Sequence, residues 1–283
     1  MREPYDVVHF EIHDNNTITL YAYSRSPFIG DTLKMKLGSN EKPTCVKCPT
    51  LITDDFLQFG KVSLGNDYEG IYKIHFPKNV THRKIPLFVY VYGGPEDLKV
   101  EMKEEDEGEW YRKYETCENQ IAKLYIDGRG TGRRGWKYRS AQFGKLGTVD
   151  AQDQITVIQY VLKKYSDILD KNRVLVSGWS YDNDYTLRYM GNATSSEYID
   201  LTDNLENFKT TRLLLLHGLA DNNVHFQNSA ILIEKLHKAR IDFDLMVYPN
   251  QGHGVFSMKQ AIFTDNCLGV SASRNSSLTC FYT

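Results

Sequence analysis

The chain has 283 residues, of which 41% are hydrophobic and 25% charged, so its composition is that of a globular protein with room for one full α/β domain plus a fragment. The formal net charge of −2 gives no reason to expect nucleic acid or an acidic membrane as a partner. No apolar stretch approaches the roughly 20 residues of a membrane helix, and the first residues lack a secretion-signal pattern, so we expect no signal or anchor in this chain.

Short β segments dominate the first part of the chain. Alternating apolar residues predict strands over 7–12, 18–23 and 32–37. Cys45 and Cys48 form a C-x-x-C pair, which is only half of a zinc site, and no second Cys/His pair follows at useful spacing. A redox pair would need a strand-to-helix context that Pro49 and its polar neighbours do not supply. A local disulfide is therefore the preferred interpretation.

From about residue 66, strand-like and helix-like segments alternate along the chain. This alternation predicts an α/β fold with a parallel sheet that helices cover on both faces. Strands are predicted over 71–76, 87–92, 122–126, 174–176, 213–216 and 243–248, and helices from 148 and over about 226–239.

A glycine-rich loop follows one of these strands. Gly130, Gly132 and Gly135 spell G-x-G-x-x-G, as in dinucleotide sites. The segment 136–147 that follows is aromatic, basic and interrupted by glycine rather than an amphipathic helix. Without a helix N-terminus the loop lacks the usual cradle for a phosphate, so a nucleotide site is disfavoured.

Three chemically reactive residues follow three predicted strands. Ser180, Asp221 and His253 occur in the order nucleophile, acid and base that α/β-hydrolases use. A serine hydroxyl is a poor nucleophile at neutral pH, and it needs a histidine to take its proton and a carboxylate to orient that histidine. Because parallel strands end at one edge of a sheet, we expect these residues to meet there.

The three residues lie in the strings Gly178-Trp179-Ser180-Tyr181, His217 to Phe226, and Gly252-His253-Gly254. These strings resemble the dipeptidyl peptidase IV branch of the prolyl oligopeptidase family. Two earlier loops, 91–95 and 127–132, are also similar to loops of this family. The resemblance implies an α/β-hydrolase fold and a Ser180, Asp221 and His253 triad, with no cofactor or metal.

Four further roles follow from the same resemblance. The Tyr92 hydroxyl and the Tyr181 backbone N–H would stabilise the oxyanion. Tyr185 would line a proline-sized pocket, for which a flat aromatic wall is suited, and Asn223 would orient the substrate backbone. Residues 17–48 resemble part of a β-propeller. We therefore expect a propeller remnant over 1–65 and a catalytic domain over 66–283, shortened after Tyr181 and divergent after Gly254.

The chain departs from the family pattern after the nucleophile string. Asp182 and Asn183 stand where the family has glycines that allow a tight turn. Ser180 and Asp221 are 41 residues apart, which is too short for two crossovers and the strand between them. We expect one helix and one central strand to be missing, so that the strand before Ser180 lacks its neighbour. The segment 265–283 is polar and rich in Ser and Cys rather than a closing helix.

The resemblance implies a serine-type dipeptidyl peptidase that releases X-Pro or X-Ala dipeptides from peptide N-termini through an acyl-enzyme. The breaks favour an alternative for this shortened chain, a catalytically inactive splice form or pseudoenzyme that acts only in binding. An esterase or lipase would use the same triad. The string from His217 to Phe226 around Asp221, here called the acid loop, and the propeller remnant count against this alternative. The full-length family form would act on peptides with proline or alanine at the second position. The resemblance also suggests that this form is a homodimer.

Localisation is inferred from the family and from surface signals. Four Asn-x-Ser/Thr sequons occur, at Asn15, Asn79, Asn192 and Asn275. The chain has five cysteines, an odd number that cannot all pair internally. These features, with the family resemblance, predict an extracellular or cell-surface glycoprotein.

Overall fold

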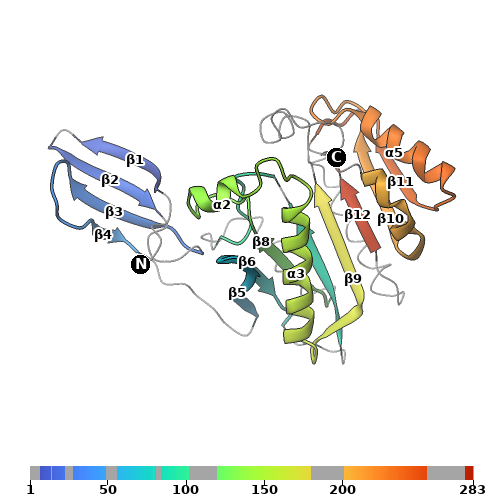
Figure 1. Ribbon diagram of the computed structural model, residues 1–283, viewed down its shortest axis with the longest axis horizontal. Helices are drawn as coiled ribbons and strands as arrows, with labels where there is room; N and C mark the ends of the chain where they lie inside the picture. Colours follow the sequence, from blue (N-terminus) through green and yellow to red (C-terminus); the bar gives the residue numbers. More distant parts are fainter. Residues whose placement is uncertain are drawn as a thin grey trace.

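A computed structural model of the chain gives the arrangement of two β-sheets and their helices (Figure 1). The structure describes residues 7–13, 15–22, 28–48, 56–78, 80, 84–92, 94–101, 120–179, 201–253 and 278–282. Among these residues, no helix has the length and apolar character needed to cross a membrane.

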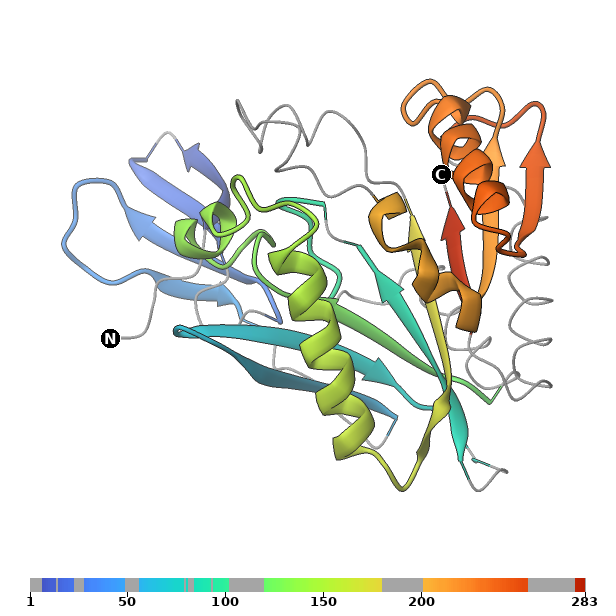
Figure 2. The same ribbon diagram turned by 45° about the vertical axis from the view of Figure 1, so that its right-hand side comes forward.

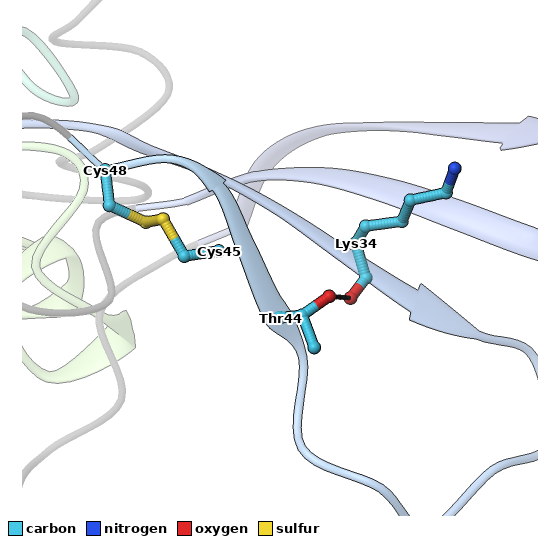
Figure 3. Close-up of a disulfide and its surroundings, with 4 residues drawn as sticks. All are labelled: Lys34, Thr44, Cys45 and Cys48. Atoms are coloured by element: carbon cyan, nitrogen blue, oxygen red, sulfur yellow. Dashed lines mark hydrogen bonds between the residues drawn. A yellow bond between two sulfur atoms is a disulfide. The ribbon is translucent and has the colours of Figure 1, made fainter.

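The first sheet is a small antiparallel meander of four strands in the order β1-β2-β3-β4. The strands are β1 (Val7–His13), β2 (Thr17–Ala22), β3 (Asp31–Lys36) and β4 (Thr44–Lys47). The three predicted strands of this region are confirmed, and so is the local disulfide, which joins Cys45 to Cys48 at the end of β4 (Figure 3). On the same strand, the Thr44 hydroxyl donates to the carbonyl oxygen of Lys34 at 3.0 Å.

The second sheet has eight strands in the order β11-β10-β12-β9-β7-β8-β6-β5. The five pairings from β8 to β11 are all parallel, whereas β5 and β6 are added antiparallel at the other edge. Its members are β5 (Leu57–Gly65), β6 (Tyr68–His75), β7 (Ile85–Val91), β8 (Ala122–Asp127), β9 (Leu169–Trp179), β10 (Arg212–Gly218), β11 (Asp244–Tyr248) and β12 (Leu278–Tyr282). The α/β class is as predicted, with a mixed rather than purely parallel sheet.

β5 belongs to the second sheet, although it lies within the range expected for the propeller remnant. The sequence predicts a propeller remnant that extends to residue 65, but β5 forms an antiparallel hairpin with β6, with Gln58 opposite Ile74. The hairpin is joined to the larger sheet through β8. The division between the two sheets therefore lies between Lys47 and Leu57.

Two helices cover one face of the large sheet. Helix α3 (Val149–Lys164) buries Val157 and Val161 completely against a cluster from β6, β7 and β8. Helix α5 (Phe226–Lys238) packs Leu236 on Leu213 of β10, beside the 3-10 helix η2 (Leu201–Thr210). The predicted helices are confirmed. Cross-strand pairing places Val89, Val176 and Leu213 on one face, so α3 and α5 lie over the same side of the sheet (Figure 1).

The glycine-rich loop differs from expectation in one respect. A short helix, α2 (Trp136–Ser140), follows Gly135, where the sequence predicts none. Residues of this helix contact the β5–β6 hairpin. The Tyr138 hydroxyl accepts a hydrogen bond from the Glu69 N–H at 2.8 Å, and the Arg134 guanidinium lies 3.7 Å from the Tyr138 ring centroid.

The expectation of an unfilled position beside β9 is wrong. β12, drawn in red in Figure 1, lies between β9 and β10 and pairs with both in parallel. Two strand edges in the middle of a sheet would leave a row of buried N–H and C=O groups without partners, which is costly. The C-terminal segment that the sequence analysis treats as divergent satisfies those groups.

Candidate active site

The candidate site lies at the edge of the large sheet where the parallel strands end. Val91, the last residue of β7, is in register with Gly178 of β9, and Gly218 of β10 is in register with Tyr248 of β11. Tyr92, Asp221 and His253 therefore follow strands that end at this common edge. Ser180, Tyr181 and Tyr185 lie outside the described residues, and β9 is described up to Trp179, which immediately precedes Ser180.

The loops after β10 and β11 are joined by backbone hydrogen bonds. The Leu219 N–H donates to the Tyr248 carbonyl at 2.9 Å, and the Ala220 N–H donates to the Gln251 carbonyl at 3.0 Å. These bonds extend the pairing of the two strands into the loops that carry Asp221 and His253. The two side chains are thus positioned by two loops that are hydrogen-bonded to each other.

Gly218 allows the two loops to approach this closely. A Cβ at position 218 would lie 2.7 Å from the Gly252 carbonyl oxygen and closer still to that of Gln251. Such contacts are shorter than van der Waals packing permits, so any larger residue would force the loops apart.

Asp221 and His253 form a hydrogen-bonded pair. His253 Nδ1 lies 3.0 Å from Asp221 Oδ2. The Asp221 side chain is completely buried and the His253 side chain is 18% exposed. The structure brings together two of the three residues that the sequence singles out as a triad, although they are 32 positions apart in the chain.

The surroundings of Asp221 keep its carboxylate ionised. Burial by itself would raise the pKa of Asp221, but three hydrogen bonds outweigh burial and hold that pKa below its ordinary value. One comes from His253, and the others come from the N–H groups of Asn223 and Val224, each at 2.9 Å to Oδ1. An ionised carboxylate can only accept, so His253 Nδ1 carries the proton and Nε2 is left as the basic nitrogen.

His217 supports the acid loop from beneath. Its ring is fully buried, with Nε2 2.9 Å from the Val224 carbonyl and Nδ1 2.7 Å from Ser229 Oγ. The carbonyl can only accept, so Nε2 carries the proton and Nδ1 accepts from the Ser229 hydroxyl. Burial lowers the pKa of His217, and a neutral ring leaves the charge of Asp221 available to His253. His217 is not among the site residues predicted from the sequence, although the run of four leucines directly before it indicates burial.

Tyr92 and Asn223 belong to the described part of the site. The Tyr92 ring lies beneath the Lys99 ammonium, 4.5 Å from ring centroid to Nζ, and close to Gly94, where a Cβ would lie 2.8 Å from the Tyr92 hydroxyl oxygen. Asn223 is exposed, and its backbone N–H holds Asp221. Their places at the sheet edge agree with contact to a substrate, but their roles remain predictions. The described residues contain no cluster of His, Cys, Asp and Glu able to hold a metal.

Asp127 ties the loop after Tyr92 to the sheet. It is 1% exposed at the end of β8 and accepts the N–H groups of Lys99 at 3.0 Å and Val100 at 2.8 Å. Burial raises the pKa of Asp127 from 3.8 to about 6, against the lowering effect of these hydrogen bonds. This carboxyl therefore binds a proton more tightly in the folded chain than in the unfolded chain.

Asp127 should make stability depend on pH in an identifiable way. Between about pH 4 and pH 6 the folded state holds more protons at this site, so its contribution to the free energy of unfolding falls as pH rises. Asp127→Asn lacks this titration. Relative to that variant, we expect the free energy of unfolding of wild type to fall by up to about 3 kcal/mol between pH 4 and pH 7. Urea unfolding at several pH values measures it. A constant difference would show that Asp127 has an ordinary pKa.

A mostly parallel sheet with a buried Asp–His pair at its carboxyl edge is the arrangement of an α/β-hydrolase. The chain belongs to the prolyl oligopeptidase family, because a sequence profile of that family matches residues 111–181 and 182–265, more than half of its length. The two matched blocks meet between Tyr181 and Asp182, the point after which the sequence is predicted to be shortened. The chain is thus an internally shortened member of the family.

Named relatives point to one branch of that family. Dipeptidyl peptidase family member 1 of Caenorhabditis elegans is 44% identical over 232 residues, which cover 69% of this chain and 29% of the relative. Dipeptidyl peptidase 4 of Sus scrofa is 34% identical, covering 67% of this chain and 29% of the relative. Venom dipeptidyl peptidase 4 of Vespa velutina is 28% identical, covering 87% of this chain and 34% of the relative. The chain therefore spans about a third or less of the length of these relatives.

Proposed function

We propose that the chain is a serine-type dipeptidyl peptidase that releases X-Pro or X-Ala dipeptides from peptide N-termini. The observation that carries this proposal is the 3.0 Å hydrogen bond between His253 Nδ1 and buried Asp221, at the sheet edge where β9 leads into Ser180. The names of the relatives support the release of dipeptides, and the preference for proline or alanine at the second position follows from the family resemblance.

In the proposed reaction, the Ser180 hydroxyl oxygen attacks the carbonyl carbon of the second residue of the peptide. His253 Nε2 takes the hydroxyl proton, and Asp221 stabilises the resulting imidazolium. The Tyr92 hydroxyl and the Tyr181 N–H donate to the oxyanion. His253 then gives its proton to the leaving amine, and the peptide bond breaks to leave the dipeptide esterified to Ser180.

Water completes the proposed cycle. His253 removes a proton from the water, which attacks the ester carbonyl. His253 then returns that proton to the Ser180 oxygen as the ester bond breaks and the dipeptide leaves. Tyr185 as a flat wall would fit a proline ring and reject larger side chains, and Asn223 would hold the substrate backbone.

A second candidate is a form that binds peptides or partners without turnover. Asp182 favours it, because a negative charge two residues after the nucleophile opposes an oxyanion in the transition state. Asn183, in place of a second family glycine, adds a Cβ at a tight turn. For the parent protein we also propose an extracellular or cell-surface location and a homodimer, following the family.

Hydrolysis of a fluorogenic Gly-Pro amide by the purified chain separates the two candidates. The matched controls are Ser180→Ala, which removes the nucleophile, and Glu234→Gln, which removes one negative charge from an exposed residue that pairs with Lys238 at 2.6 Å. Turnover that Ser180→Ala abolishes and Glu234→Gln retains would establish the peptidase. The binding form would be established if turnover does not exceed the Ser180→Ala background while the same sample binds a Gly-Pro peptide with a measurable dissociation constant.

A further inference from the structure

β9 and β10 are separated by a position in the sheet that is one strand wide, here called the slot. β9 and β10 do not pair with each other in the described sheet, since β12 separates them (Figure 2). Leu278 is in register with Leu175 on one side and with Arg212 on the other. At the far end of the strand, Tyr282 is in register with Trp179 and Leu216. The slot thus accepts one parallel strand of five residues in a defined register.

The two flanking strands need an occupant. Adjacent strands lie about 4.8 Å apart, so β9 and β10 are about 10 Å apart and cannot form direct hydrogen bonds. Both strands belong to the sheet interior, with Leu175 3% exposed, Ser177 1% and Leu215 2%. Empty, the slot would expose the backbone groups of both edges in the middle of the core.

The strand in the slot comes from an unusual place in the chain. In a sheet wound in chain order, the strand between β9 and β10 would come from residues between Trp179 and Arg212, where the family match is interrupted. Here it comes from Leu278–Tyr282, which follows all the other described strands in the chain. The sequence Leu-Thr-Cys-Phe-Tyr contains a β-branched residue and two aromatics, with no charge, Gly or Pro, as suits a central strand.

We propose that residues 278–282 are a replacement strand, which fills the position of the strand lost from the shortened chain and is held by its own chain. The replacement sets the separation between the β9 end, which leads to Ser180, and the β10 end, which leads to Asp221. The strand has this role in the sheet whether or not the chain hydrolyses peptides. Because β12 is a single strand inserted between two others, a separate peptide of the same sequence should occupy the same slot.

A proline in the strand tests this inference. Cys280 is in register with Ser177 and Leu214, at the centre of the ladder. Cys280→Pro removes a backbone donor there, and Cys280→Val changes the same side chain while keeping a strand-forming residue. We expect Cys280→Pro to lower the Tm by roughly 5–10 °C relative to Cys280→Val. Amide exchange in 174–179 and 212–216 should become about 100-fold faster. Equal Tm and exchange in the two variants would overturn the inference.

Complementation provides a second measurement that does not depend on the proline variant. The chain truncated after Ser277 is mixed with a synthetic peptide of residues 274–283 or with the same peptide carrying proline at position 280. We expect only the natural peptide to restore the exchange protection of 174–179 and 212–216. Restoration by both peptides or by neither would overturn the inference. Sedimentation of the full chain checks the source of the strand, since a dimer that Cys280→Pro dissociates would mean that a second copy supplies it.

Discussion

Asp221→Asn should lower the rate of Gly-Pro amide hydrolysis by about 10³–10⁴-fold. The asparagine oxygen can still accept the N–H groups of Asn223 and Val224, so the acid loop keeps its shape. What is lost is the negative charge, and the amide NH₂ can donate to His253 Nδ1. That donation stabilises the tautomer with the proton on Nε2, which can no longer take the Ser180 proton.

The measurement is kcat/KM of wild type and Asp221→Asn on the same substrate, with unfolding curves to show that both are folded. Glu234→Gln is the control for removal of one carboxylate charge, and it should retain wild-type turnover because it lies at the surface, far along α5 from the acid loop. A loss of less than tenfold in Asp221→Asn would mean that the pair with His253 does not serve catalysis in this chain.

The strands next to the site were predictable because their apolar runs are long and uninterrupted. Four consecutive leucines in β10 and the run in β7 can only be buried, and α/β alternation then sets the edge at which Asp221 and His253 meet. The pairing of those two residues follows from topology, since each lies in the loop after one of two adjacent parallel strands.

Other features could not be predicted because they depend on non-local pairing. The string Leu278–Tyr282 is short and follows a polar segment, and nothing local indicates that it inserts between strands about 65 and 100 residues earlier. From the sequence, β5 is expected to continue the first sheet. Its assignment to the second sheet depends on its hairpin pairing with β6. The tautomer of His217 depends on Val224 and Ser229, which only the folded loop brings to its ring.

Gly218→Ala is expected to damage the site without touching a reacting group. The added Cβ meets the backbone carbonyls of Gln251 and Gly252, which cannot rotate away as a side chain would. The loops must separate, and the bond from the Ala220 N–H to Gln251 is lost or stretched. We expect a cost of about 1–3 kcal/mol in the free energy of unfolding.

Turnover of Gly218→Ala should fall further than its stability suggests, by about 100-fold, because a shift of about 1 Å between Asp221 and His253 misorients the imidazole. Gly252→Ala is the matched control on the facing loop. A Cβ there would be 3.7 Å from its nearest neighbour, the Ala220 carbonyl oxygen, which is ordinary contact, so its stability should stay within about 0.5 kcal/mol of wild type. Urea unfolding and Gly-Pro amide hydrolysis of the two variants measure both effects. Equal behaviour of the two alanines would show that the loops can separate without disturbing the Asp221–His253 pair, and that the close approach at Gly218 is not what positions it.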